Sequence, residues 1–112
     1  MTPMAPGPDV ADPEAAARVH ARRVTAGDPR VREDLAPGAE LTPPDLFDRL
    51  LTGGFRDFEL VAHAKIGAHH VFKTRYVGSA LLVVQARWAR AGDGPWQIRE
   101  AEITRTAVPA GP

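Results

Sequence analysis

The sequence predicts a single α+β domain, with helices in the first half and a four-stranded antiparallel sheet in the second. The chain has 112 residues, about the size of one domain, and its 44% hydrophobic and 25% charged residues are typical of globular proteins. Apolar residues recur at helical spacing up to about residue 55 and at every second position after it. We therefore expect this change of period to separate two layers of one domain at 12–106, with flexible tails at 1–11 and 107–112.

Charge and composition argue against several classes of function. The 14 Lys and Arg residues balance the 14 Asp and Glu residues, so no net positive field would hold nucleic acid or an anionic membrane. Cysteine is absent, which excludes disulfides and thiolate metal sites. No run of about 18 apolar residues and no signal-like N-terminus is present. We therefore expect a cytoplasmic protein that neither binds nucleic acid nor enters a membrane.

Three helices are expected in the first half of the chain. One begins at Asp12, a favourable N-cap, and ends at Gly27. A short helix is expected at 29–35, and a third follows Thr42 and ends at Gly53. Helical spacing predicts which side chains of these helices face the core. They are Ala17, His20, Ala21 and Val24 of the first helix and Leu46, Phe47, Leu50 and Leu51 of the third.

Alternation of apolar and polar residues predicts the first hairpin of the sheet, with strands at 58–66 and 69–77. In the second strand the even positions suit the core, since the odd ones include Lys73 and Arg75. Directly paired residues share a face, so even positions must oppose even positions, which requires a loop of odd length. The simplest such loop is 67–69, because a two-residue loop would bury the two cations.

The third strand follows a turn at 78–80, and the register of the last strand decides where Glu100 lies. If the register is unbroken, Glu100 opposes Val84 and points into the core, where desolvation would favour a neutral acid. A β-bulge near Arg99 would turn Glu100 outward instead. The pattern leaves both alternatives open. The expected core positions are Leu82, Val84, Ala86 and Trp88 of the third strand and, with the bulge, Ala101 and Ile103 of the last.

With these elements in place, the chain resembles the nuclear transport factor 2-like superfamily, which includes small polyketide cyclases and ketosteroid isomerase-like enzymes. The resemblance covers 12–106 and is carried by the segments VTAGDPRV, LAPGAEL, LFDRLLTGGF, ALLVVQARW and GPWQIREAEITR. It implies a cone, in which a curved sheet wraps a long helix around a pocket, and dimers that often form through the outer sheet face. The chain looks shorter than typical members at 38–41, where a strand or hairpin would be expected.

Polar side chains on the predicted core faces are the candidate site residues, because convergent polar groups in an apolar pocket are typical of small-ligand sites. Acid–base catalysis, if present, would fall to Glu100 and His20 and would need no cofactor. We expect no metal site, since adjacent histidines on a strand face opposite ways and thus His69 and His70 cannot share an ion. The candidates for ligand binding are His70, Phe72, Thr74, Tyr76 and Trp88.

Two classes of function stay open. One is a protein that binds a small hydrophobic molecule, or a cofactor-independent enzyme of the cyclase, isomerase or hydratase type. The other is a non-catalytic homodimeric module whose cone is filled by its own side chains. A cavity large enough for a ligand would favour the first class, and a filled interior the second. The apolar residues expected to form a homodimer through the outer sheet face are Val61, Val71, Val77, Leu81 and Val83, joined by Ala101 and Ile103 only if the last strand has no bulge.

Overall fold

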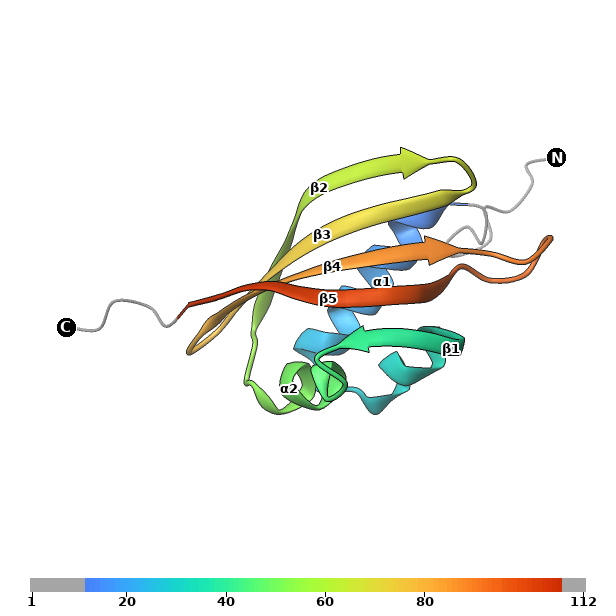
Figure 1. The fold of residues 1–112 in the computed structure, drawn as a ribbon. Coiled ribbons are helices and arrows are strands. Elements are labelled where there is room, and N and C mark those ends of the chain that lie inside the picture. The colour runs from blue at the N-terminus through green and yellow to red at the C-terminus, as the bar shows by residue number, and fades with distance from the viewer. Residues whose placement is uncertain (1–11, 108–112) are drawn as a thin grey trace, which may run out of the picture.

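Helices cover one face of a five-stranded sheet in the computed structural model, which describes residues 12–107 (Figure 1). The sheet order is β1-β5-β4-β3-β2, with β1 parallel to β5 and every other pair antiparallel. The α+β class is confirmed, but the predicted four-stranded antiparallel sheet is wrong, because a fifth strand makes the sheet mixed. The elements are α1 (Pro13–Thr25), η1 (Pro29–Asp34), β1 (Leu35–Thr42), α2 (Leu46–Thr52), β2 (Asp57–Ile66), β3 (His69–Val77), β4 (Leu81–Ala89) and β5 (Gln97–Ala107).

The ends of α1 follow the local chemistry of the sequence. The Asp12 carboxylate accepts a hydrogen bond of 2.9 Å from the Glu14 amide, and proline occupies the first helical position. The chain turns out of the helix at Gly27, whose positive φ of 67° favours glycine. The predicted core stripe of α1 is confirmed, since Ala17, His20, Ala21 and Val24 are all buried. The tails predicted at 1–11 and 107–112 lie outside the described residues, except that Ala107 ends β5.

The extra strand, β1, includes residues 38–41, where the resemblance to the superfamily suggested that the chain lacked a strand. The expected helix at 29–35 is a 3-10 helix that ends at Asp34, and the chain then runs parallel to β5. Its register is interrupted between Leu35 and Glu40, where Pro37 lacks an amide donor and Gly38 adopts a φ of 76°. A strand broken by Pro-Gly shows little alternation, which explains why periodicity missed it.

A β-bulge at Val61 corrects the predicted register of the first hairpin. The turn has two residues, with Ile66 opposite His69, and the pairing shifts between Leu60 and Ala62. Beyond the bulge, even positions oppose even positions as expected, although Phe58 pairs with Tyr76 and not with the residue that a loop at 67–69 would have placed opposite it. The predicted three-residue loop is wrong, because the bulge restores the even faces without burying the cations of β3.

A second bulge, at Arg99, selects one of the two alternatives for β5. Trp88 opposes Ile98 while Arg87 opposes Glu100, so Arg99 is the extra residue. As the bulged alternative requires, Ala101 lies in the core with an exposed fraction of 1%, and Ile103 packs against the core. The turn predicted at 78–80 is confirmed by the pairing of Val77 with Leu81.

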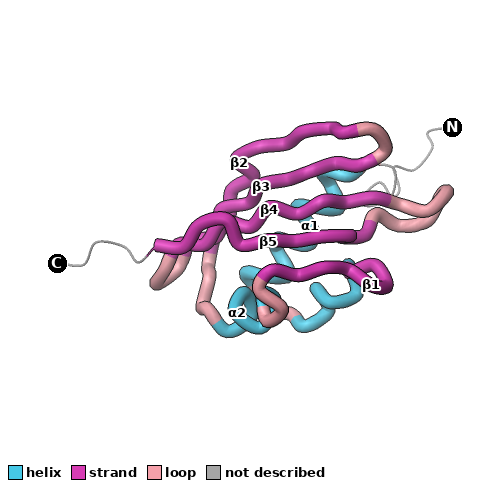
Figure 2. The backbone as a smooth tube through the Cα atoms, viewed as in Figure 1, coloured by secondary structure: helices cyan, strands magenta, loops and turns pink. Residues whose placement is uncertain are grey.

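The core lies between the helices and one face of the sheet, which we call the inner face; the opposite side is the outer face. Figure 2 shows all the helices on the same side of the strands. The largest buried side chains come from every layer: Phe47, Leu46 and Leu50 of α2, Phe72 and Tyr76 of β3, Trp88 of β4, and Ile98 of β5. Among residues 12–107, no helix is long and apolar enough to cross a membrane.

Candidate functional site

The inner face carries the predicted polar groups, but they surround almost no empty space. His20 of α1 and Thr74 and Tyr76 of β3 line a void of about 10 Å³. Such a volume holds about one water molecule. The walls are Ala17, Phe47, Val84, Ala86, Trp88, Ile98 and Ala101. At this place, side chains therefore fill the space between the helices and the sheet.

His20 is held by Asp34, a residue that the sequence analysis did not single out. The His20 Nδ1 atom lies 2.7 Å from Asp34 Oδ2, and the ring stands edge-on to Phe47 and Trp88 at centroid distances of 5.5 Å each. Arg23 Nη1 lies 3.5 Å from the other Asp34 oxygen. His20 is thus buried, as helical spacing predicted, and its polar partner is Asp34. The carboxylate fixes the orientation of the imidazole, as in His–Asp pairs generally.

Tyr76 and Thr74 both line the void. Neither hydroxyl makes a hydrogen bond to another residue within 12–107. Burial, with the negative charge of Asp34 adding to it, raises the pKa of Tyr76 above its usual value. Both hydroxyls therefore keep hydrogen-bonding capacity for a water molecule in the void.

Tyr76 should make stability fall at high pH. Because the folded protein holds the phenol proton more tightly than the unfolded chain, its contribution is complete below the unfolded pKa of about 10 and is lost as pH rises further. We expect Tyr76→Phe to change stability by less than about 1 kcal/mol at neutral pH and to flatten the decline above pH 10. Urea denaturation of both proteins at several alkaline pH values measures this; identical pH profiles would contradict the burial of the hydroxyl.

The other predicted ligand-binding residues are divided between the interior and its edge. Trp88 lines the void, whereas Phe72 is buried beside it with an exposed fraction of 1%. His70 lies outside the void, near the turn between β2 and β3, and its Nδ1 atom is 2.8 Å from His63 Nε2. His20, Thr74, Tyr76 and Trp88 are thus brought together, and His70 is not.

Glu100 is not in the interior. The bulge at Arg99 turns it to the outer face, where it is exposed and Arg87 Nε lies 3.7 Å from its Oε1 atom. The expectation of a buried acid rested on an unbroken register, which the structure lacks. The interior is therefore left without the carboxylic acid that the acid–base hypothesis needed from β5.

Glu100→Gln tests this placement. For an exposed residue with one loose ion pair, we expect the free energy of unfolding to change by less than about 0.5 kcal/mol. Urea melts of the two proteins at neutral and acidic pH should superimpose. Marked stabilisation by glutamine at neutral pH would instead indicate a desolvated carboxylate and would contradict the bulged register.

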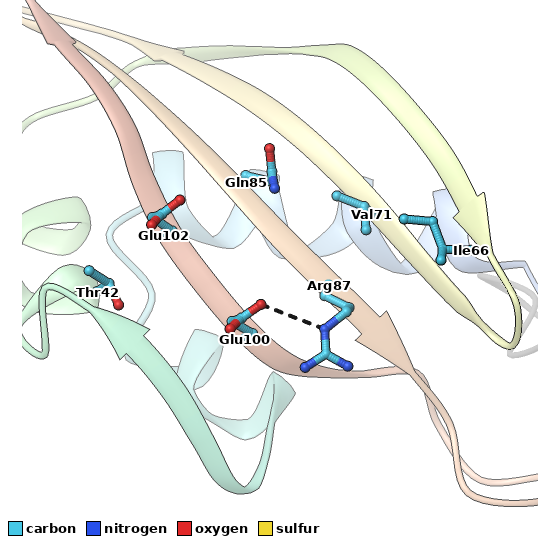
Figure 3. A pocket seen from close by; sticks show the side chains of 7 residues that line it. All are labelled: Thr42, Ile66, Val71, Gln85, Arg87, Glu100 and Glu102. Atoms are coloured by element: carbon cyan, nitrogen blue, oxygen red, sulfur yellow. Dashed lines mark ion pairs between the residues drawn. The ribbon is translucent and has the colours of Figure 1, made fainter.

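Two of the hollows on the outer face of residues 12–107 have opposite character. The acidic hollow, of about 280 Å³, lies over β5 and β4 and is bordered by β1 and the end of β2 (Figure 3). The basic hollow, of about 390 Å³, spans β2 to β5 further along the sheet. The acidic hollow is lined by Thr42, Ile66, Val71, Gln85, Arg87, Glu100 and Glu102, and the basic one by Val61, Lys73, Arg75, Val83, Thr104 and Arg105.

The apolar patch predicted on the outer face is smaller than expected. Val61 and Val77 are exposed, with fractions of 44% and 39%, but Val83 is buried. Val71 and Leu81 are partly covered. Ala101 and Ile103 have left the patch because of the bulge. What remains is a mixed surface on which charge is as prominent as apolar area.

Metal-binding groups of three or more His, Cys, Asp or Glu side chains are absent from residues 12–107.

A comparison of the whole chain with models of known protein families gave no match, and a comparison with curated protein sequences gave none either.

Proposed function

We propose that this chain is a non-catalytic homodimeric interaction module whose interior is filled by its own side chains. The observation that carries the proposal is the void of about 10 Å³ where a ligand pocket was predicted. Pockets for small ligands usually have several hundred cubic ångströms. The site that remains for recognition is therefore the outer face of the sheet.

A second copy of the chain is the partner that the outer face fits. A symmetric dimer must place one patch on an identical patch, so the patch must be self-complementary. Lys73 and Glu102 lie on either side of Gln85 at the same level of the sheet, and Gln85 belongs to the central strand. A two-fold axis over Gln85, parallel to β4, brings Glu102 of each copy to Lys73 of the other.

Of the other charges around this pair, those next to Glu102 on β1 and β5 follow the same arrangement, whereas Arg105 of β5 lies level with Arg75 of β3. Glu40 and Glu100 add negative charge on the β1–β5 side. On the β3 side, Arg75 is already paired with Glu59. Neither Lys73 nor Glu102 has an ion-pair partner among residues 12–107, so both are available across an interface. Such complementarity fixes the register of association more than it adds affinity.

The sequence pattern supports the same proposal. Its resemblance to the nuclear transport factor 2-like superfamily suggests a cone-shaped fold and a dimer through the outer sheet face. The absence of cysteine supports a reducing compartment, the cytoplasm, as the location.

A second candidate function is binding of a small hydrophobic molecule in the interior. One observation favours it: His20, Thr74 and Tyr76 converge on the void, and the two hydroxyls have no partner within the described residues. The void would have to enlarge for this, by movement of α1 or α2 away from the sheet.

Analytical ultracentrifugation tests the proposed dimer. We expect a dimer at micromolar concentrations that dissociates on dilution and weakens as salt is raised, because exposed charges are screened. A monomer at all concentrations up to about 100 μM, where even a weak specific interface would be populated, would overturn the proposal.

A further inference from the structure

The bulge at Val61 has a second consequence, because it changes the face on which His63 lies. In the register expected from the sequence, His63 would face outward with His69. Instead His63 opposes Phe72, so it shares the inner face with His70. His69 and His70 therefore lie on opposite faces, whereas His63 and His70 lie on the same face.

His63 and His70 meet end to end. Their nearest nitrogens, Nε2 and Nδ1, are 2.8 Å apart, and their ring centres are 5.1 Å apart with an interplanar angle of 31°. The centre-to-centre distance exceeds the nitrogen distance by about two ring radii, so both nitrogens lie close to the line that joins the centres. One ring donates a hydrogen and the other presents its lone pair along that line.

The surroundings hold both rings in place. His63 stacks on Phe72 at 4.1 Å and 15°, and His70 stands edge-on to Trp96 at 5.1 Å and 87°. Lys65 lies directly opposite His70, and Arg90 lies over the Trp96 ring.

We propose that His63 and His70 form a linear two-nitrogen binding site for a monovalent d10 metal ion, Cu⁺ or its analogue Ag⁺. Lone pairs that face each other along one line suit an ion that accepts two ligands at 180°. Zn²⁺, Ni²⁺ and Cu²⁺ prefer four or more ligands whose lone pairs converge at angles near 90° to 110°. The described residues supply no third ligand of the usual kinds there.

Binding needs only a small rearrangement. With metal–nitrogen bonds of about 2 Å, the two nitrogens must separate to about 4 Å. His63 is exposed on the edge strand β2, so it can move outward. The ring that donates the hydrogen bond shifts its proton to its other nitrogen, both rings stay neutral, and the site gains one positive charge. Because Lys65 opposes His70, a monovalent ion meets less repulsion than a divalent one.

Competition titration with a chromogenic Cu⁺ chelator, under anaerobic conditions, tests the site. We expect one Cu⁺ per chain, and binding about 100-fold weaker in His63→Gln and in His70→Gln, since loss of a ligand should cost at least as much as loss of an outer-shell partner. His69→Gln is the matched control: it removes a histidine from the same hairpin, but from the opposite face, where it contacts Arg87. Its affinity should equal that of the wild type.

Ag⁺ and ¹⁵N spectra of the histidine side chains of the wild type provide a readout that needs no variant. Ag⁺ should shift the His63 Nε2 and His70 Nδ1 signals and leave those of His20 and His69 in place. The proposal is overturned if other nitrogens shift, if the two glutamine variants bind Cu⁺ as well as the wild type does, or if Zn²⁺ binds more tightly than Cu⁺. Should a variant fail to fold by circular dichroism, the wild-type spectra still decide.

Discussion

Trp88→Ala is expected to lower the free energy of unfolding by about 4 kcal/mol, the largest effect of any single change considered for this protein. The Trp88 side chain is 2% exposed, lies opposite Ile98, and borders the void with His20 edge-on at 5.5 Å. Removing it takes a large apolar surface from the core and leaves a cavity that α1 and β4 cannot close fully. Urea denaturation at neutral pH measures the loss.

The same variant tests whether the interior is filled. If Trp88 occupies the space that a ligand would need, the alanine variant should bind indole, and indole should raise its stability by mass action. The wild type should gain nothing, because its void of about 10 Å³ cannot admit indole. Two results would favour the interior ligand site over the filled module. One is stabilisation of the wild type by indole, and the other is a decrease of less than about 1 kcal/mol in the free energy of unfolding of the variant.

Glu102→Lys should weaken the proposed dimer by about 10- to 100-fold, since it places a lysine against the partner's Lys73 at two symmetric points. Lys73→Glu should do the same by creating two acidic contacts. An equal mixture of the two variants should restore association as a heterodimer, because each then meets the opposite charge. Analytical ultracentrifugation of each variant and of the mixture gives the three dimer dissociation constants.

The control for charge reversal is Glu33→Lys. Glu33 is exposed in η1, on the helix side of the sheet, and should leave association unchanged. If all three variants weaken the dimer equally, net charge governs association and the proposed register is wrong. If the mixture stays monomeric while each variant is folded, Lys73 and Glu102 do not meet.

The periodic elements were predictable from the sequence because each shows its apolar pattern over a sufficient length. The α1 stripe, the core positions of α2, and the inner faces of β3 and β4 all follow their periods. A bulge leaves no such signal, since it adds one residue of ordinary type to a strand. The position of Val61 was therefore missed, and Arg99 was recognised only as one of two alternatives.

Contacts made by non-periodic segments could not be predicted from the sequence either. The expected helix at 29–35 offered no apolar face, so nothing placed Asp34 against His20 across 14 residues. The strand β1 was hidden by Pro37 and Gly38. Polar residues on core faces did predict where His20, Thr74 and Tyr76 converge. Their spacing could not predict the cavity volume, which depends on how the side chains pack.

Isotope-filtered nuclear Overhauser spectroscopy on a mixture of labelled and unlabelled protein tests whether the outer faces of two copies meet, because it detects contacts only between copies. We expect intermolecular contacts from methyl groups of the outer face, at Val61, Val71, Val77 and Leu81, and none from the helices. Absence of intermolecular contacts at concentrations near 1 mM, where a specific dimer would be populated, or contacts that arise from α1 and α2, would contradict it.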